Sequence, residues 1–328
     1  MLVLLVGVGL LDLVYVVFRR GYNNYNKFEQ TRLKHIFNDT TYHDALFIGS
    51  SRTYYHVNPN VIDTAMKLNS FNAGIDGANL LETNLILKCY LASHPAPKYV
   101  IADLSTPAFD IQPMSVFNPN IYYPFLSNKI VFNTLKPYKR VSLLRYFPFL
   151  QITECDDFLR QGAVAGLMGE IKPLAPQYKG YLESGKDTIP LPFRITYLKT
   201  DYQVNKKGTD LLLEMINTCR AQNIRLIVTY SPVYKNHDEK LNPEFFPTLT
   251  KICDTTGTTF LNYREIMLSQ NHRFFRDELH LNKFGADIFS RMLARDLKRI
   301  ISRDDSRPYR SVTSQSHSRK GRLSPENS

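Results

Sequence analysis

The residues Asp44-Ala45-Leu46-Phe47-Ile48-Gly49-Ser50-Ser51-Arg52 decide the fold of this chain. The apolar run at 45–48 predicts a short strand that is buried on both faces of a parallel sheet. Gly49 allows the chain to turn sharply as it leaves the strand. Because α/β sheets bind ligands at the carboxyl ends of their strands, Ser50 and Ser51 lie where a functional hydroxyl is expected. Glycine and serine also serve ordinary turns, so this stretch by itself leaves a nucleophile and a plain turn open.

Outward from this stretch, strands and helices alternate along the chain. Further strands are expected at 70–73, 99–104, 224–230 and 259–261, and helices at 58–67, 78–92, 207–222, 243–255 and 282–301. This alternation predicts an α/β fold over residues 44–301, a flavodoxin-like three-layer α/β/α sandwich with a parallel five-stranded sheet.

Residues 107–205 interrupt that alternation and are rich in proline, tyrosine and phenylalanine. They predict a largely helical and irregular insertion that packs over one edge of the sheet. Its aromatic residues, among them Tyr122, Tyr123 and Phe125, are either sugar-stacking platforms or ordinary core packing.

The two ends of the chain differ in composition from its middle. Residues 1–18 are almost wholly apolar, and a helix of that length spans about 27 Å, enough for the core of a bilayer. We therefore expect a transmembrane signal anchor at 1–20 and a connector at 21–43, with a cleaved signal peptide and a buried core helix as alternatives. Residues 302–328 are polar and basic without periodicity, which predicts a disordered basic tail.

The net charge of +11 and pI near 9.3 raise the question of a nucleic-acid partner. No recognition helix, zinc finger or RNA-binding motif accompanies the charge, so no nucleic-acid partner is expected. The four cysteines are far apart without metal-site spacing, and no nucleotide-binding loop is present, so neither a metal nor a cofactor is expected.

A second polar cluster precedes the last expected helix, in the segment Phe275-Arg276-Asp277-Glu278-Leu279-His280. Serine is a poor nucleophile unless a neighbouring base removes its proton, and that base works best when a third group orients it. In a turn ahead of a helix, the spacing of Asp277 and His280 lets the carboxylate bond one imidazole nitrogen while the other points to the sheet edge. An exposed polar loop with capping residues is the alternative.

Three motifs in this order resemble those of the SGNH/GDSL hydrolase superfamily. They are Gly49-Ser50-Ser51 after the first strand, Asn72-Ala73-Gly74 after the second, and Asp277-Glu278-Leu279-His280 before the last helix. The likeness to membrane-anchored bacterial SGNH-like proteins is the closer one. It covers 46–103 and 226–297 but neither the insertion nor the tail.

The resemblance implies roles for these residues. Ser51 would be the nucleophile, His280 the general base and Asp277 the acid that orients the histidine. The backbone amides of Ser51 and Gly74 would line the oxyanion hole. Ser50 stands where many members have aspartate, a change that leaves the implied triad complete.

The sequence departs from the family pattern after the third strand. Many members have an oxyanion-hole asparagine there, whereas this chain has Asp103-Leu104-Ser105-Thr106. The loss of one such donor raises a reaction barrier by roughly 2.7–4 kcal/mol. Asn79, or the hydroxyl of Ser105 or Thr106, is a candidate replacement, and Asn79 and Ser105 are also candidates for contact with substrate.

The residues that follow the serine are further candidates. Arg52, Tyr54 and His56 lie within reach of a bound substrate on sequence grounds. For Arg52, a structural ion pair with Asp103 or Asp76 is an equally good interpretation.

The resemblance finally implies an activity and a location. It suggests a serine ester hydrolase, a deacetylase or an O-acyltransferase that acts on acylated carbohydrate or cell-envelope glycan. The partners would be an acylated saccharide or other ester substrate and, through the N-terminal helix, the cell membrane, with the main domain periplasmic. A non-catalytic glycan-binding or envelope-assembly protein of the same fold is the alternative.

Overall fold

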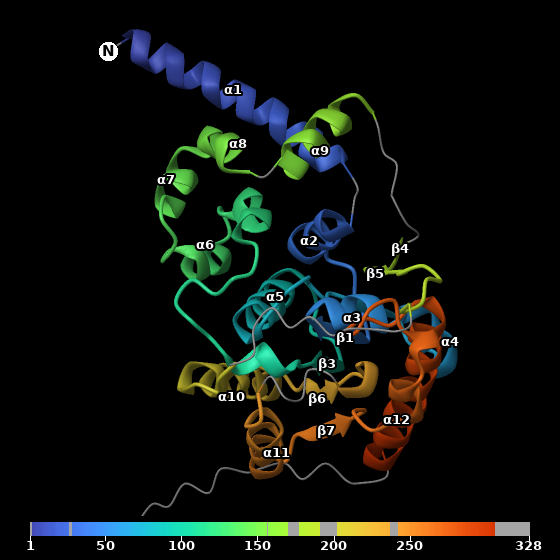
Figure 1. The fold of residues 1–328 in the computed structure, drawn as a ribbon. Helices are drawn as coiled ribbons and strands as arrows, with labels where there is room; N and C mark the ends of the chain where they lie inside the picture. The colour runs from blue at the N-terminus through green and yellow to red at the C-terminus, as the bar shows by residue number, and fades with distance from the viewer. Residues whose placement is uncertain are drawn as a thin grey trace, which may run out of the picture.

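The computed structural model describes residues 2–25, 28–155, 157–169, 177–190, 202–236 and 242–305 (Figure 1). Its centre is a five-stranded sheet with the strand order β2-β1-β3-β6-β7, and every neighbouring pair is parallel. The strands are β1 Ala45–Gly49, β2 Ser70–Asn72, β3 Tyr99–Asp103, β6 Arg225–Tyr230 and β7 Thr259–Asn262. The predicted fold class is confirmed. The strand order reverses between β1 and β3, which is where open α/β sheets bind their ligands.

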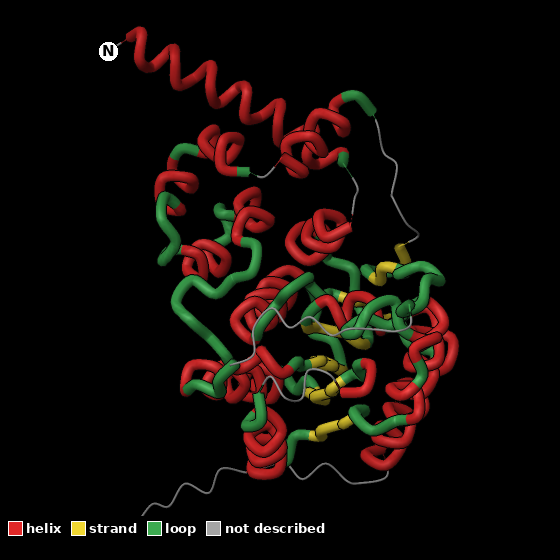
Figure 2. Tube along the Cα trace, viewed as in Figure 1, coloured by secondary structure: helices red, strands yellow, loops and turns green. Residues whose placement is uncertain are grey.

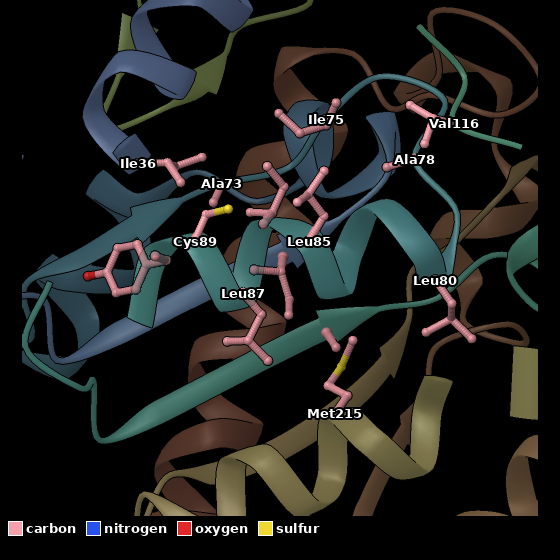
Figure 3. Close-up of a cluster of buried hydrophobic side chains, with 14 of the residues drawn as sticks. Ile36, Ala73, Ile75, Ala78, Leu80, Leu85, Leu87, Cys89, Val116 and Met215 are labelled. Atoms are coloured by element: carbon pink, nitrogen blue, oxygen red, sulfur yellow. The ribbon is translucent and has the colours of Figure 1, made fainter. Parts of the chain in front are cut away.

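Helices cover both faces of the sheet because successive strand residues point to opposite sides. On one face, Leu46 and Ile48 pack into a cluster with α2 (Phe28–Asn38), α5 (Leu80–Ser93), α10 (Lys206–Ala221) and α11 (Phe245–Thr256). Part of that cluster appears in Figure 3, where side chains of α5 lie beside Met215 of α10. On the other face, Ala45 and Phe47 pack against α4 (Pro59–Met66) and α12 (Lys283–Asp305).

Asparagine caps begin the helices that follow the strands. Asn58 accepts a hydrogen bond from the Asn60 amide at 3.1 Å, and Pro59 occupies the first helical position of α4. Asn282 caps α12 in the same way through the Gly285 amide at 3.0 Å. These caps begin the helices that the sequence predicts at 58–67 and 282–301.

The described part of the 107–205 insertion is mainly helix and loop (Figure 2). Its helical elements are η1 Thr106–Phe109 at its start, η2 Pro119–Phe125, α6 Lys129–Leu135, α7 Val141–Tyr146, η3 Pro148–Leu150, α8 Gln151–Glu154 and α9 Asp157–Leu167, and a short hairpin joins β4 Gln177–Tyr178 to β5 Tyr181–Leu182. Tyr122, Tyr123 and Phe125 are buried, so they are core residues rather than sugar platforms. The buried carboxylate of Glu82 on α5 accepts hydrogen bonds from the hydroxyl of Tyr122 and the amide of Phe117, which fixes the insertion to the sheet domain.

The expected membrane anchor is wrong. In the part of the chain that the structure describes, no helix combines the length and apolarity needed to cross a bilayer. The helix at this position, α1 (Leu2–Asn24), lies beside α9 of the insertion (Figure 1). Its polar residues serve the fold, since the Tyr15 hydroxyl donates to Gln151 at 2.9 Å and Arg19 donates to the Pro124 carbonyl. Tyr22 is fully buried in the main cluster. The predicted single-pass membrane location is not supported.

The structure differs from the prediction in two further segments, the connector and the C-terminal tail. The expected connector at 21–43 contains α2, whose Leu33 and Ile36 are fully buried, because apolar residues three apart on a helix share one face. The expected tail starts inside α12, which continues to Asp305, while residues 306–328 lie outside the described residues. Cys89, Cys155, Cys219 and Cys253 are all buried, and none of them forms a disulfide.

The rings of His35, His43 and His94 lie close together, and we expect them to make the stability of the fold depend on pH. Burial, together with the charges of His35, His94 and Lys179, lowers the pKa of His43 to about 4. A base with a depressed folded-state pKa stabilises the fold only while it is neutral, so stability falls as the pH drops from the ordinary value near 6.5 toward 4. The contribution of His43 is up to about 3 kcal/mol. Thermal unfolding of wild type and His43→Phe between pH 7.5 and 4 should show the steeper loss in wild type, and parallel curves would contradict this expectation.

Candidate active site

Ser51 stands at the start of a short helix directly after β1. Gly49 ends the strand at a φ of +146°, and a Cβ atom there would lie 2.3 Å from Thr53 Oγ1 and 2.4 Å from the Asp103 carbonyl oxygen. Glycine is therefore required for this turn. Ser50 caps the helix α3 (Ser51–His56), whose first residue is Ser51. The serine hydroxyl consequently lies at the carboxyl edge of the sheet, beside the end of β3.

Asp277 and His280 lie in a tight turn just before α12. A bridge between the fully buried Phe275 and Leu281 closes the turn. The Arg276 amide donates to the His280 carbonyl at 2.9 Å, and the Asn282 amide donates to the Phe274 carbonyl at 3.0 Å. Within the turn, Asp277 Oδ1 accepts the amides of Leu279 at 3.0 Å and His280 at 2.9 Å. These bonds fix the carboxylate next to the imidazole ring.

The structure brings Ser51, His280 and Asp277 together in one hydrogen-bonded row. His280 Nε2 lies 2.8 Å from Ser51 Oγ, and His280 Nδ1 lies 2.8 Å from Asp277 Oδ1 and 3.0 Å from Oδ2. An ionised carboxylate only accepts hydrogen bonds, so Nδ1 carries the proton and Nε2 is free to accept the proton of the serine.

The carboxylate of Asp277 is held in its ionised form. Burial acts to raise the pKa of Asp277, but the hydrogen bond and charge of His280, the Leu279 amide and the Arg276 guanidinium outweigh burial. Together they hold the pKa of this carboxyl well below its usual range. Arg276 donates to Asp277 Oδ2 at 3.2 Å and packs over the ring of Tyr55 at 4.5 Å. Asp277 therefore remains charged throughout the neutral pH range.

A cavity of about 420 Å³ opens at Ser51 and His280. Four regions that are far apart in the sequence form its wall: the turn after β1, the loop after β2, the loop after β3 with the insertion that follows it, and the turn before α12. The lining residues are Ser50, Ser51, Arg52, Gly77, Ala78, Asn79, Ser105, Thr106, Pro107, Asp110, Gln112, Ser115, Phe117, Tyr202, Leu279 and His280. This volume suits a small organic ligand or one sugar unit with its substituent.

The residues predicted to form the oxyanion hole or to contact substrate differ in whether they line the cavity and in whether their polar groups are already hydrogen-bonded. Gly74 does not line the cavity, and its amide donates to the Asn72 side chain at 3.0 Å, so its predicted place in the oxyanion hole does not match this arrangement. Asn79 lines the cavity, but its side chain caps α5 and donates to the Ser115 carbonyl at 2.8 Å. Ser105 lines the cavity and makes no capping hydrogen bond to η1.

The residues after the serine turn mainly inward. Arg52 reaches the cavity wall, yet its side chain is buried, donates to the Leu104 carbonyl at 2.8 Å and lies 3.8 Å from Asp103. Arg52 therefore makes the structural ion pair with Asp103 that the sequence suggested, and it also forms part of the cavity wall. Tyr54 and His56 are buried at 3% and 0% exposure and do not line the cavity, so the idea that they contact substrate is wrong.

Sequence reasoning missed Gly77, Phe117 and Tyr202, which all line the cavity. Gly77 has a φ of +66°, and a Cβ atom there would lie 2.3 Å from the Phe117 ring. The Asp76-Gly77 pair is a recognisable turn signal. No local pattern marks Phe117 or Tyr202 as neighbours of Ser51. Among the described residues, no group of histidine, cysteine and acidic side chains could hold a metal ion.

No protein-family model matches the sequence, and no curated protein matches it either. The solved structures that are similar in fold include those of three proteins. A Desulfitobacterium hafniense protein assigned to the G-D-S-L family of lipolytic proteins has a TM-score of 0.40 and 11% identity over 76% of this chain and 97% of its own. A Bacteroides fragilis protein assigned as an acylhydrolase has a TM-score of 0.40 and 11% identity over 78% and 87%.

The third is the psychrotrophic esterase EstA of a Pseudoalteromonas species, in a structure inhibited by monoethylphosphonate. It has a TM-score of 0.43 and 12% identity over 79% of this chain and 99% of its own. At this distance the similarity concerns the fold alone, and the interpretation of the site rests on its own geometry.

Proposed function

We propose that this chain is a serine hydrolase of the SGNH type that cleaves carboxylic esters by a Ser-His-Asp mechanism. The observation that carries the proposal is the row Asp277, His280, Ser51, with hydrogen-bonding distances of 2.8 Å on both sides of the imidazole. This row opens into a cavity of about 420 Å³ at the carboxyl edge of the sheet. In the proposed domain organisation, residues 44–301 form the hydrolase domain, and the insertion at 107–205 supplies one wall of its cavity.

In the proposed reaction, Ser51 Oγ attacks the carbonyl carbon of the ester while its proton passes to His280 Nε2. The resulting imidazolium is stabilised by the ionised Asp277, which accepts its Nδ1 proton in a hydrogen bond. Collapse of the tetrahedral intermediate breaks the ester bond, and His280 returns the proton to the departing alkoxide. A water molecule then repeats the sequence on the acyl-serine. A sugar hydroxyl in place of water would make the reaction an acyl transfer.

The negative charge on the intermediate needs fixed donors. The amide of Ser51 is one candidate, because the first amides of a helix have no partner within it. The other donors assigned from the sequence are engaged elsewhere, since the Gly74 amide donates to the Asn72 side chain and the Asn79 side-chain amide donates to the Ser115 carbonyl. For the second donor we propose either the backbone amide of Gly77 or the hydroxyl of Ser105. Both residues line the cavity.

The proposed substrate is an acylated saccharide. The cavity wall combines the aromatic rings of Phe117 and Tyr202 with the polar side chains of Asp110, Gln112 and Ser115. Aromatic faces pack against the C–H face of a sugar ring, while carboxylate, amide and hydroxyl groups bond its hydroxyls. A deacetylase or O-acyltransferase acting on envelope glycan is the specific form of this proposal.

Fluorophosphonate labelling tests the proposed function directly, since the reagent phosphonylates only an activated serine. Wild type should be labelled, and Ser51→Ala and His280→Ala should not. Ser50→Ala is the matched control, because it removes the adjacent hydroxyl and should retain labelling. If well-folded wild type resists the reagent, the hydrolase proposal fails. The engaged amides of Gly74 and Asn79 would then favour a glycan-binding protein, and glycan affinity would be measured next.

Phe117 provides a test of the substrate class. Its side chain is 66% exposed at the cavity wall although a ring of this size is usually buried. Phe117→Ala should raise KM for acetylated sugars by roughly 10-fold with little change in kcat, because stacking acts on the bound ground state and the transition state alike. The same change should leave KM for p-nitrophenyl acetate within about 2-fold. Equal effects on both substrates would contradict a sugar platform.

A further inference from the structure

A second row of polar groups lies directly behind Ser51 and His280, on the side away from the cavity. It consists of His56 at the end of α3, Ser231 just after β6, and Asp103 at the end of β3. Their exposed fractions are 0%, 1% and 3%. Polar groups are buried this deeply only when they are paired, so the bonds between them indicate what the row does.

The hydrogen bonds of this row have one consistent direction. The Leu281 amide donates to His56 Nε2 at 3.0 Å, so the ring proton of His56 must be on Nδ1. Nδ1 then donates to Ser231 Oγ at 3.1 Å, and the Ser231 hydroxyl donates to Asp103 Oδ2 at 2.8 Å. Asp103 Oδ1 also accepts the Ser231 amide at 2.7 Å. Burial, followed by the charges of His280 and Arg52, lowers the pKa of His56 well below its ordinary value, so the ring is neutral.

The row ends at the residues that follow the two reacting groups, at the backbone amide of Leu281 and at the side chain of Arg52. Leu281 is the residue after His280, and Arg52, the residue after Ser51, lies 3.8 Å from Asp103. His56 also closes the helix that Ser51 begins, and its carbonyl accepts the Ser290 hydroxyl of α12 at 3.2 Å. The same three side chains therefore tie the turn of the serine to the turn of the histidine.

The Leu281 amide has no partner within its own turn. In the bridge between Phe275 and Leu281, the hydrogen bonds are made by the flanking Arg276 and Asn282 amides. The Leu281 amide consequently points out of the turn and toward α3. A neutral imidazole nitrogen is the acceptor that meets it there.

We propose that His56 is a positioning residue that sets the distance between His280 and Ser51. Ser231 and Asp103 hold the His56 ring in the tautomer whose Nε2 accepts the Leu281 amide, and this bond fixes the backbone that carries His280. This inference rests on the proposed hydrolase function. An error of about 1 Å in the placement of a reacting group lowers the rate by roughly 100-fold.

Substituting His56 with glutamine or with asparagine tests the roles of its two ring nitrogens separately. The side-chain amide of glutamine reaches the position of Nε2, so His56→Gln keeps an acceptor for Leu281. The amide of asparagine reaches only the position of Nδ1, so His56→Asn keeps the bond to Ser231 and loses the acceptor. With p-nitrophenyl acetate as the probe, His56→Asn should lower kcat by roughly 30- to 100-fold with KM within about 3-fold, and His56→Gln should stay within about 5-fold of wild type.

A measurement independent of turnover accompanies the kinetics. Hydrogen exchange of the Leu281 amide in the full-length protein should speed up at least about 10-fold in His56→Asn and little in His56→Gln. Equal kcat values in the two variants, or unchanged Leu281 exchange in His56→Asn, would overturn the proposal. If His56→Asn does not fold, Ser231→Ala serves instead, and it should lower kcat by roughly 3- to 10-fold because the ring loses its tautomer preference.

Failure of this inference differs from failure of the proposed function. If wild type shows no Ser51-dependent turnover, the hydrolase proposal fails, while the exchange of the Leu281 amide still decides whether His56 holds that turn. If wild type turns over normally and both His56 variants match it, only the positioning role is lost.

Discussion

Replacing His280 with alanine should lower kcat for ester hydrolysis by at least about 10⁴-fold while the protein remains folded. The serine proton has no other acceptor at 2.8 Å among the interactions of the described residues, and an unassisted hydroxyl is a weak nucleophile at neutral pH. Only the stabilisation by oxyanion donors and by binding would remain. The side chain lies at the cavity wall rather than in the core, so its loss removes hydrogen bonds without leaving an internal void.

His272→Ala is the matched control for this prediction. His272 lies in η7 (His272–Phe274), eight positions before His280 in the same segment, and it does not line the cavity. Steady-state kinetics with a chromogenic ester and thermal unfolding should be measured on both variants. Turnover that survives in folded His280→Ala would remove the histidine from the mechanism, whatever the control shows.

The second large effect is expected for Asp277→Asn, with a fall in kcat of about 10⁴-fold. Aspartate accepts the Nδ1 proton of His280 and so leaves Nε2 free for the serine. An asparagine amide can instead donate to Nδ1, which favours the tautomer with its proton on Nε2. That tautomer cannot accept the serine proton. Glu278→Gln, which neutralises the adjacent carboxylate outside the cavity, should keep kcat within about 3-fold of wild type.

The difference in stability between wild type and Asp277→Asn should also depend on pH and become smaller in acid. The folded-state pKa of Asp277 lies well below its ordinary value. A carboxylate of this kind stabilises the fold above the unfolded-state pKa near 3.9, and the contribution is lost as the pH falls through the lower folded-state value. Wild type should therefore unfold at a higher temperature than Asp277→Asn above about pH 5, and the difference should shrink in acid. If the difference in unfolding temperature between wild type and Asp277→Asn instead grew as the pH fell, the stabilising role of the ionised Asp277 would be contradicted.

The sheet was predictable because its signals are local. Residues 45–48 and 99–102 are short apolar runs, and strands with both faces buried need such runs. Asn58 and Asn282 are caps whose side chains bond amides two or three residues away, so they too act within a few residues. Interactions of this range can be read from one stretch of sequence.

The N-terminal prediction failed because hydropathy describes a segment and not its surroundings. The apolar run at 1–18 has the composition of a membrane span, but the second half of α1 packs on the insertion through Tyr15, Arg19 and Tyr22. The close contact of Gly21 with α9 illustrates this, since a Cβ atom there would lie 2.0 Å from the Ala163 carbonyl oxygen. Nothing within residues 1–24 identifies that partner.

Local signals in the sequence predict the strand pattern, the starts of α4 and α12, and the proposed site residues Ser51, Asp277 and His280, because each lies in a stretch with its own pattern. The packing of distant segments, by contrast, brings the side chains of Ser51 and His280, which are 229 positions apart, to a distance of 2.8 Å. It also decided that Phe117 and Tyr202 line the cavity, and that His56 and Ser231 lie behind the site instead of within it. Such contacts depend on how helices pack across the sheet, and packing joins residues that share no local pattern.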